Sequence, residues 1–361
     1  MKAIKLATLA CLALPAIASA DYQIKDGNNV MNIGGQLRTE FHTGINQSGY
    51  TSNTAQRFSE VTVNTANVHF AGAINEKLIY KMRLKLAPQN TSNEIDTSDT
   101  SGTHHAHGTY DMVDYALAGY SFMPELNVVM GKIAWGIGFD NQSSAMSPLS
   151  MAQDRDYFVS SGTTNGIVAY GTLMETIDWN ITAANQFASQ SGNNDNRSMD
   201  YSVTLAHHGK EAADAEGYNV AGDFKHYVAV DYAQMFQNGD NRKAFAATGF
   251  FSYQNYVLHT GATVENTVGK KDDFWTVGAG YLFNKTWRPS VTYTSARSNT
   301  ANGNIGRHGY AAVNLTQFHD DNRWRNYFEF STIQRSDEAK AASVGKKETP
   351  WQVAVGLTVN L

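Results

Sequence analysis

Apolar and polar residues alternate with a two-residue period in segment after segment of this chain. In residues 77–86, leucine, tyrosine and methionine occupy the even positions, whereas lysine, arginine and one isoleucine occupy the odd positions. Residues 351–361 alternate in the same way up to the last residue. Because successive side chains of a strand point to opposite faces of a sheet, each such segment predicts an amphipathic strand. The period therefore favours an all-β fold whose sheet has one apolar face and one polar face.

Residues 1–20 have the composition of a secretory signal peptide. Lys2 and Lys5 form a basic start, residues 6–17 are largely apolar, and residues 18–20 read Ala-Ser-Ala, a small-residue cleavage site. Beyond this segment no apolar run approaches the ~20 residues that a spanning helix needs. An exported chain that ends on an amphipathic strand predicts a signal peptide at 1–20 and a transmembrane β-barrel at 21–361.

The composition agrees with a barrel that has no disulfide bonds. The single cysteine, Cys11, lies in the predicted signal peptide, so the mature chain is expected to have no disulfide. A lipoprotein cysteine is the alternative, but the sequence Thr8-Leu9-Ala10 precedes it. Aromatic residues reach 11% of the chain, as interfacial girdles require. The net charge of −5 does not indicate nucleic acid as a partner.

Alternation and turn chemistry predict about sixteen strands, an even number as a single-chain bacterial barrel requires. The predicted strands lie near residues 30–43, 60–75, 77–87, 110–122, 125–138, 164–173, 176–188, 199–208, 224–237, 243–252, 256–265, 274–284, 286–297, 309–319, 323–335 and 350–361. Within 208–265 a count that differs by two strands also fits the sequence.

Short and long connections alternate along the chain. The tight turns are predicted at Asn75-Glu76, Met123-Pro124, Met174-Glu175, Asn284-Lys285 and Asp320-Asp321-Asn322. The long polar segments are 44–59, 88–109, 139–163, 189–198, 298–308 and 336–349. Short periplasmic turns opposite long external loops are typical of outer-membrane barrels. Residues 209–223 are the exception, since they are long but fall on the side of the turns.

A soluble β-sandwich also alternates, so it remains an alternative. Its apolar faces pack against each other, however, and large aromatic residues have no reason to gather at strand ends. In this chain the six tryptophans lie within the predicted strands or at their ends, where the aromatic belt of a membrane barrel would be. These tryptophans are Trp135, Trp179, Trp275, Trp287, Trp324 and Trp351.

The last strand resembles the insertion signal of Gram-negative outer-membrane barrels, although Leu361 stands where that signal usually has Phe or Trp. Together with the signal peptide, the length and the hairpin pattern, the mature chain resembles an outer-membrane porin. Residues 131–138 are similar to a Gly- and Lys-rich strand of phosphate-selective porins. The resemblance implies a homotrimer of sixteen-stranded barrels in outer-membrane lipid and lipopolysaccharide, each with its third external loop folded inward.

Residues 139–163 are the candidate for that inward-folded loop. They hold the charged residues Asp140, Asp154, Arg155 and Asp156. A charged constriction would screen solutes in a narrow, focused field; the alternative is an ordinary solvated loop. Phosphate-selective porins place several basic residues near the constriction, whereas this loop offers Arg155 alone, so phosphate specificity is not predicted.

A ladder of basic residues is the clearest electrostatic signal. Lys77, Lys81, Arg83 and Lys85 project from one face of 77–86. Facing lipid would cost roughly 2–4 kcal/mol for each near the midplane, so the face is predicted to line the lumen. The same interpretation places these further residues on the pore wall: Arg38, Lys132, Lys225, Arg288, Arg325 and Arg335, with Glu40, Asp114, Asp231 and Glu329 against them. A net basic wall predicts mild anion preference, unless the charges pair across strands and leave little field.

Metal and enzyme sites are not predicted. His104, His105 and His107 cluster in a loop, but neighbours in an extended chain point to opposite sides, and the same holds for His207-His208. No short motif ties acidic and histidine residues such as His69, Asp111 and His319 into a catalytic group. The expectation is therefore no metal, no cofactor and no enzymatic activity.

The function predicted from the sequence is passive diffusion of small hydrophilic solutes and ions through a water-filled channel, with mild anion preference. Two alternatives stay open. One is a substrate-selective channel for phosphate, other anions or sugars. The other is a structural or adhesin barrel whose loops bind a partner and whose lumen is closed.

Overall fold

The computed structural model describes the strands of the chain and the tight connections between them. It covers residues 22–45, 57–86, 113–135, 162–185, 199–209, 222–237, 240–267, 270–297, 307–319, 324–335 and 351–360. Within these ranges no helix is long and apolar enough to cross a membrane.

Seventeen β-strands occupy the described ranges. In chain order they are β1 (Tyr22–Asp26), β2 (Asn29–Ile45), β3 (Arg57–Ile74), β4 (Leu78–Lys85), β5 (Val113–Met123), β6 (Leu126–Trp135), β7 (Gly162–Leu173), β8 (Ile177–Asn185), β9 (Met199–His208), β10 (Gly222–Gln237), β11 (Asp240–Gln254), β12 (Tyr256–Thr267), β13 (Lys270–Tyr281), β14 (Trp287–Arg297), β15 (Arg307–His319), β16 (Trp324–Arg335) and β17 (Trp351–Asn360).

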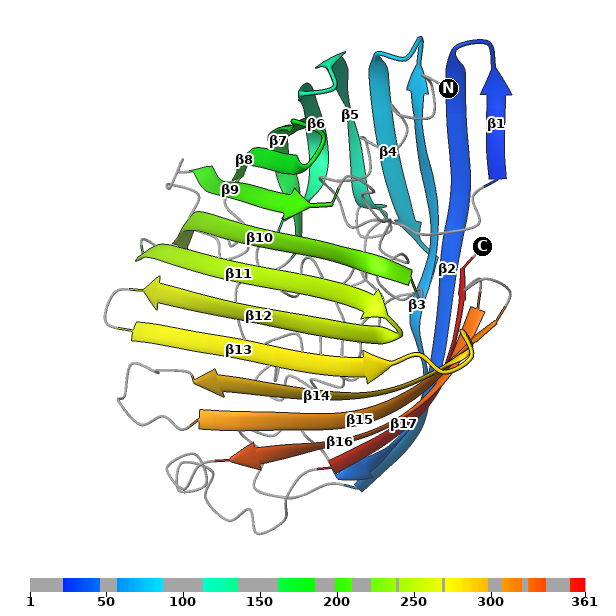
Figure 1. Ribbon diagram of the computed structural model, residues 1–361. Helices are drawn as coiled ribbons and strands as arrows, with labels where there is room; N and C mark the ends of the chain where they lie inside the picture. Colours follow the sequence, from blue (N-terminus) through cyan, green and yellow to red (C-terminus); the bar gives the residue numbers. More distant parts are fainter. Residues whose placement is uncertain are drawn as a thin grey trace, which may run out of the picture.

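Sixteen of these strands, β2 to β17, form a closed antiparallel barrel (Figure 1). Each strand pairs with the next one along the chain, and β17 returns to pair with β2 from Gln36 to Ile45. Closure gives both edges of every strand a hydrogen-bonding partner, which a sheet surrounded by lipid requires. The sixteen predicted strands correspond one to one with β2–β17, so the predicted barrel and strand count are confirmed.

The first strand, β1, was not predicted. It pairs with Asn29–Ile33 of β2 through a tight turn in which Gly27 has a φ of 56°. Since β3 occupies the other edge of β2, β1 and β17 lie along the same edge, and β1 continues the line of β17 beyond its end. Five residues with two charges gave too weak a pattern to identify this strand from the sequence.

The tight turns lie at one end of the barrel, here called the turn edge. Asn75-Glu76, Met174-Glu175 and Asn284-Lys285 all have positive φ, as the two central residues of a type I′ hairpin turn require. In each turn the residue after the two central ones donates its N–H to the carbonyl of the residue before them, as Lys77 N does to Ile74 O at 3.2 Å. The long predicted loops leave from the opposite end, the loop edge, and most of their residues are outside the described ranges; β2, β3, β7 and β15 include the outermost residues of three of these segments.

The outer face of the barrel is apolar and the inner face is polar. On β14, Val291 and Tyr293 point outward and are 56% and 37% exposed. Arg288, Ser290 and Thr292 point inward and are buried. A soluble sandwich would bury its apolar face instead, so this arrangement rules out that alternative and favours a barrel with hydrocarbon outside.

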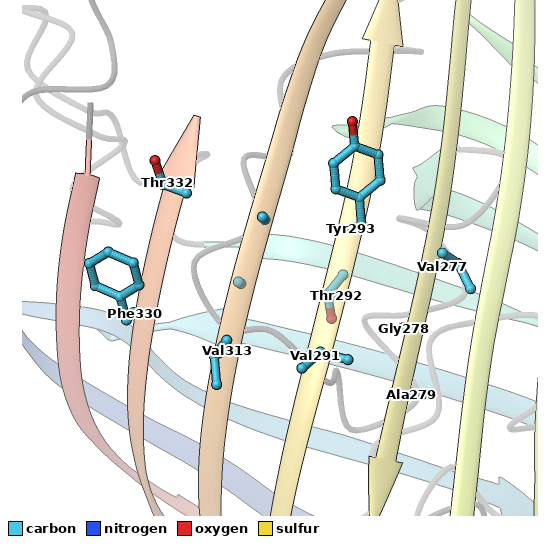
Figure 2. A pocket seen from close by; sticks show the side chains of 11 residues that line it. Val277, Gly278, Ala279, Val291, Thr292, Tyr293, Val313, Phe330 and Thr332 are labelled. Carbon is cyan, nitrogen blue, oxygen red and sulfur yellow. The ribbon is translucent and has the colours of Figure 1, made fainter. Parts of the chain in front are cut away.

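A groove of about 440 Å³ crosses this outer face over β13–β16 (Figure 2). Its walls include Val277, Val291, Val313 and Phe330, and small alanines lie between them. Tyr293 leans along the sheet toward the loop edge, where a Cβ on Gly309 would lie 2.7 Å from its hydroxyl oxygen. No charged side chain lines the groove, so this part of the surface suits hydrocarbon contact.

An arginine on this surface should be poorly tolerated. Val313, which is 57% exposed on the outer face, is the test position, and Val313→Leu is the control. We expect Val313→Arg to lower the free energy of unfolding in lipid vesicles by roughly 2–4 kcal/mol near mid-membrane, measured by denaturant titration. Equal stability of the two variants would contradict the assignment of this face to lipid.

Candidate functional site: the inner wall of the barrel

The predicted basic ladder lies on the inner face of β4. Lys81, Arg83 and Lys85 share alternate positions with buried Ile79, whereas Leu78 points outward and is 45% exposed. Lys77 lies one residue before the strand, in the turn, and is exposed. Three of the four predicted ladder residues are therefore brought together on one strand.

A β-bulge on β5 supplies the counter-charge to this ladder. Arg83 pairs with Tyr115 and Leu84 with Val113, so Asp114 is an extra residue in β5. The bulge turns two consecutive side chains inward, and Asp114 and Tyr115 are 4% and 0% exposed. Without the bulge, strict alternation would place only one of the two on the wall.

Two cations share the Asp114 carboxylate. Arg83 forms an ion pair with it through its guanidinium, and the Lys85 ammonium lies 2.9 Å from its other oxygen. The guanidinium carbon of Arg83 lies 4.8 Å from the centre of the Tyr115 ring, and the ammonium nitrogen of Lys81 lies 5.6 Å from it. Cation–π attraction acts at these distances. The side chains of Arg83 and Lys85 remain 26% and 30% exposed, so a local positive charge faces the lumen.

A second cluster bridges the closing seam of the barrel. Arg38 and Glu40 on β2 form an ion pair, and the Tyr327 hydroxyl on β16 donates to the same carboxylate. Tyr327 reaches Glu40 across the whole width of β17 because its ring lies over Gly356. The absence of a side chain at Gly356 therefore allows a direct contact between β16 and β2.

A third cluster lies near the turn edge on β14–β16. Arg288 is fully buried, with its guanidinium carbon 5.0 Å from the centre of the Phe318 ring. Phe318 pairs in register with Arg325, so the ring stands next to both cations. A buried charge is costly unless neighbouring groups solvate it. The Arg288 charge is therefore enclosed by packed side chains, whereas the cations of the ladder on β4 remain partly exposed to the lumen.

Glu329 provides a buried carboxylate one step farther along β16. It is 0% exposed and accepts hydrogen bonds from Asn314 Nδ2 at 3.0 Å and the Tyr310 hydroxyl at 3.3 Å. Two donors from β15 thus satisfy it within the wall. The predicted inner positions of Arg288, Arg325 and Glu329 agree with the alternation of burial on β14 and β16.

Several charged groups on the wall were missed or underweighted by the sequence interpretation. Arg242 pairs with Glu265 between β11 and β12. Asp178 accepts from Thr172 at 2.6 Å and lies 3.2 Å from His208 Nε2. Further buried inner carboxylates are Asp200 and Asp231. These acids offset part of the predicted basic excess. Apart from Asp231 they were not predicted from the sequence, because no two of them lie on one strand as a ladder.

Lys132 departs from its predicted place. Buried Val129 and Ile133 occupy the inner positions of β6, whereas Lys132 shares the parity of Met130, which is 59% exposed. The register therefore places Lys132 on the outer face and not on the pore wall. Its ammonium donates to the Val113 carbonyl at 2.5 Å, which satisfies part of its hydrogen-bonding need there.

The remaining predicted residues cannot be placed in the same way. Arg335 ends β16, but its side chain is outside the described residues, as are the constriction candidates Asp140, Asp154, Arg155 and Asp156. In the described part of the chain, no group of three or more His, Cys, Asp or Glu side chains is arranged to hold a metal.

Comparisons with known proteins find similarity in structure and none in sequence. No protein-family model matches the sequence, and the curated proteins give no match. Among solved structures, Salmonella typhi OmpF in complex with daunomycin has a TM-score of 0.62 at 17% identity, over 94% of this chain and 100% of that one. The outer-membrane channel DcaP of Acinetobacter baumannii has a TM-score of 0.59 at 12% identity, with 94% and 99% covered.

A third similar structure is an anion-selective porin from Comamonas acidovorans, with a TM-score of 0.58 at 11% identity over 92% of this chain and 100% of that one. At these identities the similarity establishes the fold alone. The chain has the fold of the outer-membrane porins over nearly its whole length. The similarity of residues 131–138 to phosphate-selective porins is not confirmed by these structures and stays a prediction.

A side chain at Gly356 should displace the seam tyrosine. We expect Gly356→Ala to lower the free energy of unfolding by about 1–3 kcal/mol, as overpacking typically does. In a Tyr327→Ala background the same alanine should cost much less, because the clashing ring is gone. Gly222→Ala is the control, since nothing lies within 4 Å of a Cβ there. An equal cost of Gly356→Ala with and without Tyr327 would refute the seam contact.

Proposed function

We propose that this protein is an outer-membrane porin that lets small hydrophilic solutes and ions diffuse passively through its lumen. The observation that carries the proposal is the closed sixteen-stranded barrel with an apolar outer face and a charged, hydroxyl-rich inner face. A soluble protein would bury its apolar face, whereas a water-filled channel through a membrane needs an apolar outer face and a polar inner face. No reaction is involved; selectivity comes from pore radius and wall charge.

We propose further that the channel prefers anions mildly. Support comes from the β4 ladder, where Arg83 and Lys85 share one carboxylate and stay partly exposed to the lumen. The ion pair of Arg242 with Glu265, whose arginine side chain is 23% exposed, is balanced. The expected preference is therefore local and small, because acidic groups elsewhere on the wall offset much of the remaining basic charge.

Sugar selectivity finds less support. A sugar-binding lumen needs exposed aromatic faces on which pyranose rings can stack. The inward rings Tyr115, Phe318 and Tyr327 are at most 6% exposed, and a guanidinium lies close to the face of each ring. The rings therefore fix the orientation of the cations. We propose in addition that the protein assembles as a homotrimer in lipid and lipopolysaccharide and needs no cofactor.

Reversal potentials across a planar bilayer in a KCl gradient test the selectivity. We expect wild-type protein to reverse on the anion-selective side, and Asp114→Asn to increase that selectivity because it removes the shared counter-charge. Arg83→Gln/Lys85→Gln should shift reversal toward cations. Lys132→Gln is the matched control, since this lysine lies on the outer face and should leave the reversal potential unchanged.

Two outcomes would contradict the proposal in different ways. Cation-selective reversal of wild-type protein would reject the anion preference while leaving the channel intact. A shift with Lys132→Gln but none with the β4 variants would reject the assignment of the inner wall.

A further inference from the structure

Two histidines from adjacent strands meet on the outer face near the turn edge. His207 lies one residue before the end of β9, and His226 lies near the start of β10. Nε2 of His226 is 2.9 Å from Nδ1 of His207, and the two rings are stacked with centroids 5.0 Å apart. The buried neighbours His208 and Tyr227 point inward, so the pair lies on the opposite face.

Local structure holds this pair in place. The ladder between β9 and β10 begins at the pair Tyr227 with His208, so His226 stands one residue beyond the ordered register. The Phe224 ring stacks on His226 with a centroid distance of 5.4 Å and an interplanar angle of 20°. Phe224 is 59% exposed. The three rings form a row near the turn edge of the outer face.

We propose that His207 and His226 form a two-imidazole binding site for a divalent transition metal ion such as Cu²⁺ or Ni²⁺. Imidazole nitrogens bind such ions at about 2.0–2.1 Å. Two nitrogens at right angles around one ion are then about 2.9 Å apart, and two in a tetrahedron about 3.3 Å. The observed 2.9 Å separation matches the right-angled arrangement, which Cu²⁺ and Ni²⁺ favour.

Binding requires a change of tautomer and a small rotation of both rings, because in the hydrogen bond the two facing nitrogens point at each other and not at a common ion. In the hydrogen-bonded pair one ring donates its N–H to the other ring, so one of the two facing nitrogens carries a proton. That proton moves to the second nitrogen of the same ring, and both facing nitrogens then present lone pairs to the ion. The other coordination positions are left for water.

This site could not be found by reading along one strand. His207 and His208 are neighbours in sequence, and alternation sends them to opposite faces of the barrel. His208 turns inward to Asp178, at 3.2 Å. The partner of His207 comes from the next strand, 19 positions away, and only the β9–β10 register brings the two together.

The experiment measures Cu²⁺ binding to the full chain folded in lipid, in a background carrying His104→Gln, His105→Gln and His107→Gln. We expect this background to bind one Cu²⁺ per chain, with electron paramagnetic resonance showing coordination by two nitrogens. Adding His226→Gln or His207→Gln should weaken binding at least tenfold. His319→Gln is the matched control, because this ring also lies at the outer turn edge but stacks on Trp324 with centroids 3.6 Å apart.

Folding of each variant is checked by its heat-modifiable electrophoretic mobility. Unchanged affinity after His207→Gln or His226→Gln in the folded barrel would overturn the proposal. So would a spectrum without nitrogen coordination, or an equal loss of binding with His319→Gln.

Discussion

Every backbone N–H and C=O group in a membrane needs a protein partner, and this constraint governs the whole structure. A β-sheet meets this requirement only when it closes on itself and leaves no unpaired edge strand. The pairing of β17 with β2 closes the sheet, so the other fifteen strand pairings of the barrel depend on it. β1 extends the same edge of β2 beyond the end of β17. β1 and β17 thus lie along one line, and together they cover the edge of β2.

Closure also explains where the charges lie. Once the sheet is closed, alternate side chains of each strand face either lipid or the lumen. A row of lysine and arginine residues must face the lumen, because facing lipid would cost free energy at each charged position. The wall then neutralises its charges locally. A bulge brings Asp114 to Arg83 and Lys85, and a glycine lets Tyr327 reach Glu40 across a strand. Among the described ion pairs, the two cations that share Asp114 on β4 keep their side chains 26% and 30% exposed.

The sequence predicted periodic features well and local irregularities poorly. All sixteen barrel strands, and the positions of the tight turns at Asn75-Glu76, Met174-Glu175 and Asn284-Lys285, followed from alternation and turn residues, because both patterns lie within a few consecutive positions. The bulge at Asp114, the parity of Lys132 and the short β1 did not follow, since each breaks or barely shows the period. Glu265, Asp178 and His226 gained their roles from neighbours on other strands, and a single sequence does not state that register. The path of residues 139–163 and their four charged residues stays a prediction.

Diffusion of solutes through this protein requires an open aqueous path inside the barrel. Single-channel recording of the purified, refolded protein in a planar bilayer tests it most directly. The structure predicts discrete, ohmic current steps of nanosiemens order in concentrated KCl, because a sixteen-stranded wall lined with charged and hydroxyl groups stays wet. Persistent silence from protein shown to be folded and inserted would contradict an open path and would favour a barrel with a closed lumen.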